Sequence, residues 1–413
     1  MPELLTVSQA LERLLATFRP VNSETVHLAQ ASGRVLAEDF YAPFDYPSFD
    51  NSSMDGFAVC SLDVAAASQT QPVTLAIVDD IPAGHVTTKI LQPGDAARIM
   101  TGAVLPMGAD AVVPVEDTDS KEYDLPITLG QVNIFRAVKP GDYVRSRGQD
   151  LHVGELLLSR GTRLRPQDVG LLAMLGIPRL EVYRLPRVAV LSSGDELIPV
   201  DEPLRPGMIH ESNSTMLAAL VSQTGDALYL GNAPDRPEAI QAVLDRAVAE
   251  NVDLILTSAG VSVGVFDYVR SVVETNGRLD FWRVNMRPGK PLAFGSYRNV
   301  PFIGLPGNPV SAFVGFEVFV RPAIAKLAGH IGVLRPRLRV TLTEPVETDG
   351  RESYLRAVIT WQGSCWAARL TGHQGSGNLY SLVQANALLI VPSEVKSPPT
   401  GTELDAWLLD PVF

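Results

Sequence analysis

The chain has 413 residues, of which 46% are hydrophobic and 19% are charged, and its formal net charge is −12 at pH 7. This length allows about two to four domains that each bury a core, so a single small domain is excluded. The acidic balance argues against a broad nucleic-acid surface, because such surfaces need basic faces that release counterions.

The sequence carries no signal for a membrane or for export. No run of about 18 uncharged apolar residues is present, so we expect no membrane-spanning helix. Glu3 and Glu12 lie where a signal peptide would carry positive charge, so we expect a cytoplasmic protein. Cys60 and Cys365 are too few for a disulfide framework, and the six histidines show no spacing typical of a zinc site.

The N-terminal part is predicted to combine a helix with a β-rich region. Thr6 and Gln9 form a capping box at the start of a helix over 6–18, in which apolar residues recur at helical spacing. Over 46–145, short apolar runs separated by Gly and Pro indicate a β-rich module. Helical character returns at 165–176, so we interpret the β-rich part as an insertion.

From residue 187 onward, strands and helices alternate. Strands are predicted at RVAVLSSGDE, VDLILTSAG and VPFIGLPGNP, and helices over 213–222, 237–250, 267–275 and 310–327. Continuous apolar strands that alternate with helices form parallel sheets covered on both faces, and ligands bind at the carboxyl ends of such strands. Here these ends are the small-residue turns at 192–194, 258–260 and 305–307.

After about residue 335 the pattern is β-rich again, with apolar runs such as RLRVTLTEPVE, YLRAVITWQ and ALLIVPS. We therefore expect a small C-terminal β domain. No internal repeat or low-complexity tract is visible.

The turn SAGVSVGVFDY, at 258–268, has the composition of an anion-binding loop. Its glycines let the backbone approach a bulky anion, and the helix that follows would direct its N-terminal amides at the anion. Asp267 is either the N-cap of that helix or a ligand of a metal and a nucleotide. A Walker motif is excluded, because its spacing is absent. The same reasoning applies to GLPGNPVSA at 304–312, where Asn308 either caps a helix or donates to an oxyanion.

The segment NMRPGKPLAFG, at 285–295, sets two cations on one turn. Pro288 fixes one backbone angle and Gly289 permits a tight turn, so Arg287 and Lys290 are expected to lie near each other. Such a pair is favourable when a dianion lies between the two charges, and the guanidinium fork suits a tetrahedral oxyanion. The alternative is a solvated hairpin tip with incidental cations.

Several acidic residues lie in small-residue turns, where their carboxylates could hold Mg²⁺, a cation that prefers oxygen ligands and substrate phosphates. They are Asp50, Asp55, Asp150, Asp195 and Glu196. Each of them alone is more often a turn residue than a ligand. Their number beside glycine turns favours a metal-dependent site.

Seven segments in chain order, together with TGHQGSG at 371–377, carry a family resemblance. They are SSMDGFAV, IMTGAVLP, RSRGQDL, LSSGDEL, TSAGVSVGVFDY, MRPGKPLAFG and GLPGNPVSA. Taken together, they closely resemble the molybdopterin molybdenumtransferase family, which includes the E domain of gephyrin. The resemblance covers nearly the whole chain.

The resemblance implies a multidomain α/β and β fold. Its parts are a doubly wound α/β molybdopterin-binding domain, an inserted β domain, a discontinuous N-terminal domain and a C-terminal β-barrel. The boundaries that follow are 1–45 with 146–178 for the N-terminal domain, 46–145 for the inserted domain, 179–330 for the α/β domain and 331–413 for the barrel.

The resemblance also implies the reaction. A Mg²⁺-dependent transferase would take molybdate and adenylylated molybdopterin, cleave the phosphoanhydride and yield molybdenum cofactor and AMP. The protein would be a homodimer that works with a molybdopterin adenylyltransferase and with molybdoenzyme acceptors. It would bind neither nucleic acid nor membrane. Two alternatives stay open: a molybdopterin adenylyltransferase on the same α/β domain, and a non-catalytic, gephyrin-like scaffold.

Site residues are carried over by motif. The catalytic positions so implied are Asp55, Thr101, Asp150, Glu196, Asp235 and Asp267, with Asp267 and Glu196 as metal ligands. The first three lie in segments that in the family approach the site across the dimer. The implied molybdate-binding residues are Arg287, Lys290, Ser311, Arg356 and Ser376. The pterin and nucleotide loops contain Ser258, Gly260, Gly264, Pro306, Gly307, Asn308 and Pro309. The chain departs from the usual family pattern at Gln149, at His210-Glu211 and at Ala259.

Overall fold

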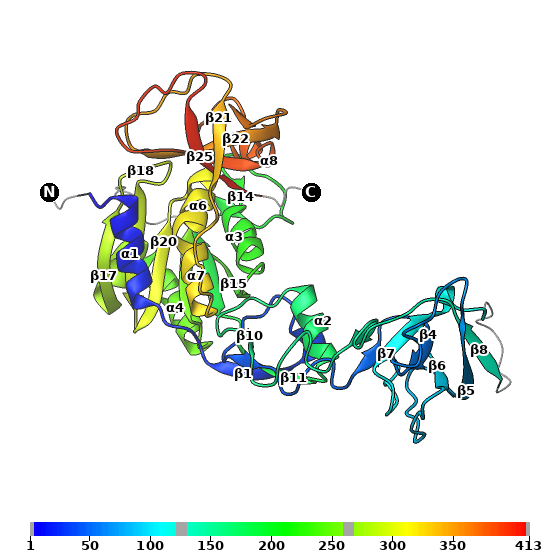
Figure 1. The fold of residues 1–413 in the computed structure, drawn as a ribbon. Helices are drawn as coiled ribbons and strands as arrows, with labels where there is room; N and C mark the ends of the chain where they lie inside the picture. Colours follow the sequence, from blue (N-terminus) through cyan, green and yellow to red (C-terminus); the bar gives the residue numbers. More distant parts are fainter. Residues whose placement is uncertain (1–3, 121–129, 259–267, 410–413) are drawn as a thin grey trace. The chain divides into compact units, whose positions relative to one another are not determined.

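The computed structural model describes residues 4–120, 130–258 and 268–409. The chain forms two compact units, one joining Met1–Glu38 to Arg160–Phe413 and the other comprising Asp39–Ser159 (Figure 1). None of the helices in the described ranges combines the length and the apolar character needed to cross a bilayer.

The unit Asp39–Ser159 is β-rich, as its composition predicts. A five-stranded sheet has the order β7-β4-β6-β5-β8. Its strands are β4 (Gly56–Val59), β5 (Val73–Ile81), β6 (Asp95–Ile99), β7 (Ala111–Pro114) and β8 (Gln131–Ile134). Two short pairs accompany it, β2 (Phe40–Tyr41) with β10 (Leu156–Leu158) and β3 (Asn51–Ser52) with β9 (Val144–Arg145). Alternate residues such as Phe57 and Val59 on β4 and Val113 on β7 form its buried core.

The larger unit begins with α1 (Val7–Thr17), which has the predicted capping box. The Thr6 N–H donates to Gln9 Oε1 at 2.9 Å, and the Gln9 N–H donates to Thr6 Oγ1 at 3.2 Å. Further on, β1 (Ser23–His27) pairs antiparallel with β11 (Arg179–Tyr183). These two strands flank the other unit in sequence, together with the short helices η1 (Leu28–Gln30) and α2 (Pro166–Met174).

A six-stranded sheet of order β15-β12-β16-β20-β19-β17 forms the centre of the larger unit. The parallel strands are β12 (Arg187–Ser193), β15 (Asp226–Ala233), β16 (Leu254–Ser258) and β20 (Val300–Leu305). At one edge, β19 (Pro291–Tyr297) and β17 (Gly277–Arg283) run antiparallel, which the sequence did not predict. The helices between them are α3 (Asn213–Val221), α4 (Pro237–Ala249), α5 (Tyr268–Asn276), α6 (Pro309–Gly315) and α7 (Arg321–Leu327). A short parallel pair, β13 (Leu197–Ile198) with β14 (Ile209–His210), follows β12.

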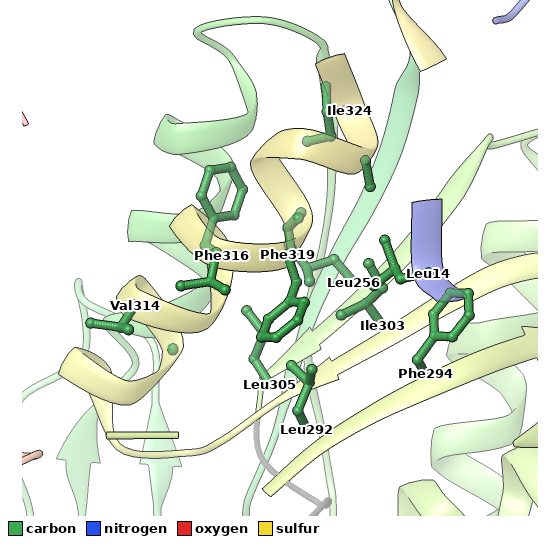
Figure 2. Close-up of a cluster of buried hydrophobic side chains, with 14 of the residues drawn as sticks. Leu14, Leu256, Leu292, Phe294, Ile303, Leu305, Val314, Phe316, Phe319 and Ile324 are labelled. Atoms are coloured by element: carbon green, nitrogen blue, oxygen red, sulfur yellow. The ribbon is translucent and has the colours of Figure 1, made fainter. Parts of the chain in front are cut away.

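Apolar side chains cover both faces of this sheet, so the prediction of a doubly wound domain is confirmed. On β16, Leu254 and Leu256 pack with α1, α3, α6 and α7, whereas Ile255 packs with α4 and α5. Figure 2 shows the first face, where Leu14 of α1 and Phe319 meet Leu256 and Ile303. Burying each such side chain contributes roughly 1.5–3 kcal/mol.

The predicted helix over 310–327 is not one regular helix. A π-helical segment, Phe316–Val320, separates α6 from α7. Its residues are buried, including Glu317, which binds Arg335 at 2.6 Å and Arg321 at 3.3 Å. The apolar periodicity runs through the segment without a break, so it gave no signal of the interruption.

The C-terminal part is a closed β-barrel, as expected. Its strands are β21 (Leu338–Leu342), β22 (Glu352–Trp361), β23 (Trp366–Leu370), β24 (Ala387–Val391) and β25 (Glu403–Leu408), with α8 (Leu379–Val383) between β23 and β24. The barrel closes because β22 pairs with both β23 and β24. In addition, β18 (Met286–Arg287) pairs parallel with β22, which joins the barrel to the α/β domain.

Candidate functional site: a basic pocket between sheet and barrel

A pocket of about 400 Å³ lies where the turn after β18, the loop after β20 and α6 meet the barrel. It is lined by all five residues expected to bind molybdate: Arg287, Lys290, Ser311, Arg356 and Ser376. Pro306, Gly307 and Asn308 line it as well, and Pro309 is the first residue of α6. The structure thus brings together side chains that lie up to 89 positions apart, from residue 287 to residue 376.

Arg356 is the fully buried member of this group. It lies on β22 with a relative exposure of 0%, and its Nε donates to Ser381 Oγ at 3.0 Å. Its terminal nitrogens donate to three backbone carbonyls in 373–375, at 2.9–3.3 Å. Within the described part of the chain, no carboxylate bonds to it. Burial, and then the charge of Arg287, lowers the pKa of Arg356 to about 10.

The energetics of this arrangement favour an anionic ligand. A buried charge is normally paired, because desolvation without a counter-charge is costly. Arg356 keeps its hydrogen bonds, but no described side chain supplies it with negative charge. An anion in the pocket would provide that charge.

Three further cations line the pocket at lower burial. Lys290 is exposed, and Arg287 Nη1 lies 3.9 Å from Asp349 Oδ2, with both side chains about 40% exposed. Arg351 also binds Asp349 and donates to the carbonyl of Met286 at 3.0 Å. Hydrogen bonding from Arg351 is the main cause of a lowered pKa of Asp349.

The turn between Arg287 and Lys290 has the tight geometry that its sequence predicts. Gly289 has a φ of +101°, a conformation that residues with a side chain rarely adopt. The two cations on either side of the turn both line the pocket.

The first turn of α6 binds the loop that carries Ser376. Asn308 occupies the N-cap position, but its side chain does not cap the helix. Instead, its Nδ2 donates to Ser376 Oγ at 3.0 Å, and the Val310 N–H donates to the Ser376 carbonyl at 3.1 Å. Ser311 is 3% exposed and lies one residue further along α6. These bonds hold the two serines at the pocket.

At the carboxyl ends of the strands, Asn213 ties two loops together. Its Nδ2 donates to Ser258 Oγ at 2.7 Å and to the Gly307 carbonyl at 2.7 Å. Its Oδ1 is buried and has no hydrogen-bond partner among the described residues. Ser212 is the N-cap of α3 and Asn213 is its first residue. Ala259, Gly260, Gly264 and Asp267 lie outside the described residues.

Glu211, one of the departures from the family pattern, is buried beside this network. Its carboxylate accepts hydrogen bonds from Ser192 Oγ at 2.8 Å and from the N–H and Oγ of Ser214 at 2.7 and 2.6 Å. It therefore links the end of β12 to the start of α3. His210 is exposed, and its Nε2 lies 2.9 Å from the Glu202 carbonyl oxygen.

Acidic residues gather at the ends of the neighbouring strands β12 and β15. The Asp235 N–H donates to Asp195 Oδ1 at 3.0 Å. Glu196 directly follows Asp195 in the chain. Burial, followed by the charges of Asp195 and Glu196, raises the pKa of Asp235. A Cβ at Gly194 would lie 2.8 Å from Glu196 Oε2, so a larger residue there would displace this carboxylate.

Whether a metal ion fits the site depends on this acidic group. Burial is the main cause of the raised pKa of Asp235, and the charges of Asp195 and Glu196 add to it; a divalent cation would offset all of these effects. No group of three or more His, Cys, Asp or Glu side chains is arranged as a metal site within 4–120, 130–258 and 268–409. The second predicted metal ligand, Asp267, lies outside these ranges.

The remaining predicted catalytic residues belong to the unit Asp39–Ser159. Asp55 Oδ1 accepts hydrogen bonds from the Thr101 N–H at 2.7 Å and from Thr101 Oγ1 at 2.8 Å, so these two form a pair. Asp150 is exposed, and its N–H donates to the Tyr46 carbonyl at 3.0 Å. Gln149, another departure, accepts from the Ser146 N–H at 3.2 Å.

Two residues of the pocket, Arg351 and Gln374, were not predicted. Gln374 Oε1 accepts from the N–H of Arg356 at 2.9 Å, which fixes the loop beside the guanidinium. Neither residue lies in a motif with its own chemistry. Gln374 falls within the TGHQGSG segment, which is the signal that could have pointed to it.

The chain combines an α/β domain with a C-terminal β-barrel, and comparison with known proteins identifies its family. Residues 5–176 match the family described as "MoeA N-terminal region (domain I and II)", residues 189–326 match "Probable molybdopterin binding domain", and residues 339–409 match "MoeA C-terminal region (domain IV)". The matches follow one another along nearly the whole chain.

Individual relatives agree with this result. A molybdopterin molybdenumtransferase of a Nostoc species is 40% identical over 379 residues, which cover 90% of this chain and 85% of that protein. Molybdopterin molybdenumtransferase 2 of Mycobacterium tuberculosis is 39% identical over 407 residues, 97% of each chain. The crystal structure of the molybdopterin biosynthesis moeA protein from Pyrococcus horikoshii matches with a TM-score of 0.83 at 31% identity, covering 98% of this chain and 100% of that one. The chain therefore belongs to the molybdopterin molybdenumtransferase family, and the family and fold class expected from its motifs are confirmed.

Proposed function

We propose that this chain transfers molybdenum from molybdate into adenylylated molybdopterin and releases AMP, which completes the molybdenum cofactor. Arg356 carries this proposal: it is a buried guanidinium that lines a pocket with Arg287 and Lys290, and no carboxylate bonds to it among the described residues. Relatives that bear the name molybdopterin molybdenumtransferase support it.

Molybdate is a tetrahedral dianion, and the pocket offers it donors of two kinds. Arg356 is held by Ser381 and by backbone carbonyls, so its guanidinium is already oriented before the anion arrives. A preorganised donor in a partly dry site stabilises charge without the cost of reorientation. Arg287 and Lys290 are more exposed and supply long-range attraction. Ser311 and Ser376 supply hydroxyl donors.

The loops at the strand ends would hold the pterin and the nucleotide. Ser258, Asn213 and the Pro306–Asn308 turn lie on the α/β side of the same region. The buried Oδ1 of Asn213 has no described partner and can accept a hydrogen bond from a ligand N–H. Gly260 and Gly264 stay predicted contacts on the basis of the family resemblance.

Glu196, Asp235 and Asp267 would hold Mg²⁺ at the ends of β12 and β15 and before α5. A bound Mg²⁺ would neutralise the charge that develops on phosphate when the phosphoanhydride breaks. By holding the ion near the phosphoanhydride, these carboxylates would position the reacting groups, and positioning of this kind can supply much of a rate enhancement. The proximity of Asp235 to Asp195 supports this assignment, because the Asp235 N–H donates to Asp195 Oδ1 and Glu196 follows Asp195 in the chain.

Other parts of the prediction rest on the family resemblance. They are the approach of Asp55, Thr101 and Asp150 to the site across a homodimer, the four-part domain boundaries, the adenylyltransferase and molybdoenzyme partners, and the cytoplasmic location. Native mass spectrometry would measure the assembly. A loss of AMP release in Asp55→Asn while the protein remains a dimer would support a contribution of Asp55 to the site across the interface.

The test of the proposed function is AMP release from adenylylated molybdopterin on addition of molybdate, with Mg²⁺ present. We expect molybdate-dependent AMP in the wild type, and a raised molybdate requirement in Lys290→Ala but not in Lys139→Ala, an exposed lysine of the other unit. Pyrophosphate release from ATP would instead identify an adenylyltransferase. If neither AMP nor pyrophosphate is released, the non-catalytic scaffold remains as the alternative.

A further inference from the structure

A second basic pocket, of about 250 Å³, lies in the same compact unit and shares no residue with the first. It forms where the loop 32–35 and the residues after β11 meet the turn after α3 and the end of α7. Its lining includes Arg34, Arg163, Arg184 and His330.

This second pocket lies at the amino ends of the parallel strands, whereas the candidate active site lies at their carboxyl ends. Leu185 and Gly225, which line it, come shortly before β12 and β15, whereas the acidic group follows these strands. The seven residues of β12 therefore separate the two regions. At the usual rise of about 3.3 Å per residue, this is roughly 20 Å.

The charges around the second pocket leave a positive excess in a chain whose net charge is −12. Arg34 pairs with Glu24, and Arg184 pairs with Asp253 at 2.6 Å. Arg163, by contrast, has no ion pair among the described residues, and its Nε donates only weakly to the Gly33 carbonyl at 3.4 Å.

The neighbouring elements add to this excess. Arg321 and Arg335 share a single carboxylate, Glu317. Burial, followed by the charges of Arg163 and Arg321, lowers the pKa of the half-buried His330. Among the arginines that line the pocket, Arg163 therefore carries a charge that no described carboxylate balances.

One donor in the wall also lacks an acceptor. The Nε of Arg34 is buried and has no hydrogen-bond partner in the part of the chain that the structure describes, although one terminal nitrogen binds the Tyr183 carbonyl at 2.8 Å. Buried donors without acceptors are rare in folded proteins, so the neighbours of Arg34 leave its guanidinium incompletely satisfied.

We propose that this second pocket binds a small phosphate-type oxyanion, inorganic or at the end of a small metabolite, at a site separate from the molybdate pocket. Guanidinium forks match tetrahedral oxyanions, and a ring N–H of His330 offers a further donor. The volume is below the roughly 300 Å³ at which sites for drug-sized ligands begin, which favours a small anion. A bound anion would link the β1–β11 segment to the α/β domain.

Isothermal titration of the full-length protein with inorganic phosphate, pyrophosphate or AMP tests the proposal. We expect phosphate binding in the wild type and in Lys290→Ala, in which the molybdate pocket is weakened. Arg163→Gln should weaken this binding by about tenfold or more, the size of one lost charge-assisted contact, and Arg163→Lys should restore part of it. Arg369→Gln, an exposed charge change on the barrel, is the matched control.

Each outcome decides the matter. Tighter binding of pyrophosphate or AMP than of phosphate, if it is weakened in Arg163→Gln, would identify the source of the phosphate group. Equal phosphate affinity in the wild type and in folded Arg163→Gln would overturn the proposal. Loss of all phosphate binding in Lys290→Ala would also overturn it, because phosphate would then bind only in the molybdate pocket.

Discussion

The guanidinium of Arg356 donates to the hydroxyl of Ser381 at 3.0 Å, and both side chains are buried. Ser381 belongs to α8, so this bond ties the helix between β23 and β24 to the strand that carries the buried cation. The orientation of Arg356 towards an incoming anion depends on it.

Ser381→Ala should therefore weaken molybdate binding more than it slows turnover. Removing a hydrogen bond to a charged group costs roughly 1.5–3 kcal/mol, and we expect a fall in the unfolding midpoint together with a severalfold rise in half-saturating molybdate. Steady-state AMP release and thermal unfolding measure the two effects. Ser364→Ala, at an exposed turn, is the control. An unchanged molybdate requirement in Ser381→Ala would show that the bond does not orient Arg356.

Lys290→Ala should show a defect that depends on ionic strength. Lys290 is exposed, so salt screens its attraction for molybdate. The screening (Debye) length is about 10 Å at 0.1 M salt and about 3 Å at 1 M. The difference from the wild type in molybdate affinity should be largest at low salt and should shrink as salt rises. Titrations at several salt concentrations measure it, with Lys139→Ala alongside. A difference that stays constant with salt would point to a direct contact in a dry site.

Asp349→Asn should increase the affinity for molybdate. Asp349 lies 3.9 Å from Arg287 and also binds Arg351, so its negative charge competes with the dianion for both arginines. We expect a lower half-saturating molybdate concentration in AMP release, while Asp405→Asn, which affects a barrel ion pair, should leave it unchanged. Weaker binding in Asp349→Asn would mean that the carboxylate chiefly positions the arginines.

Asp235→Asn should stabilise the protein at neutral pH in the absence of Mg²⁺. Burial and the neighbouring carboxylates raise the pKa of Asp235 above its ordinary value of 3.8, so its ionised form is disfavoured in the folded state. The native carboxyl therefore loses stability as the pH rises through its folded pKa. The advantage of the amide should be present at pH 7 and disappear as the pH falls towards 3.8.

Thermal unfolding across pH, with and without Mg²⁺, measures this effect. Addition of Mg²⁺ should raise the midpoint of the wild type more than that of Asp235→Asn, because the carboxylate gains a counter-charge. Asp201→Asn, an exposed acid, controls for the general change in net charge. Equal responses to Mg²⁺ in the wild type and Asp235→Asn would remove Asp235 from the proposed metal site.

The sequence predicted those helices and strands well that are determined by interactions between residues close in the chain or by the burial of a whole strand. The capping box of Thr6 and Gln9, Pro237 at the start of α4 and the apolar strands of the sheet all have the predicted structure. These features depend on contacts within a few residues or on burial of a whole strand. The π-helical break at Phe316–Val320 depends on packing around Glu317 and has no local signature.

The assembly of the pocket could not be read from the residues alone. Arg287 pairs with Ser353 in the parallel register of β18 and β22, and this register brings the turn at 287–290 to Arg356, three residues further along β22. Such a pairing joins segments far apart in the chain. Arg356 was predicted as a site residue only through the family resemblance. The sequence left Asn308 as either a helix cap or an oxyanion donor, and in the structure its side chain donates to Ser376.

A crystal structure of the protein soaked with molybdate tests the central claim most directly, because the anomalous signal of molybdenum locates the anion. We predict one strong peak in the pocket of Arg287, Lys290, Ser311, Arg356 and Ser376, within hydrogen-bond distance of the Arg356 guanidinium. Molybdenum bound only elsewhere, with this pocket empty at saturating molybdate, would contradict the account.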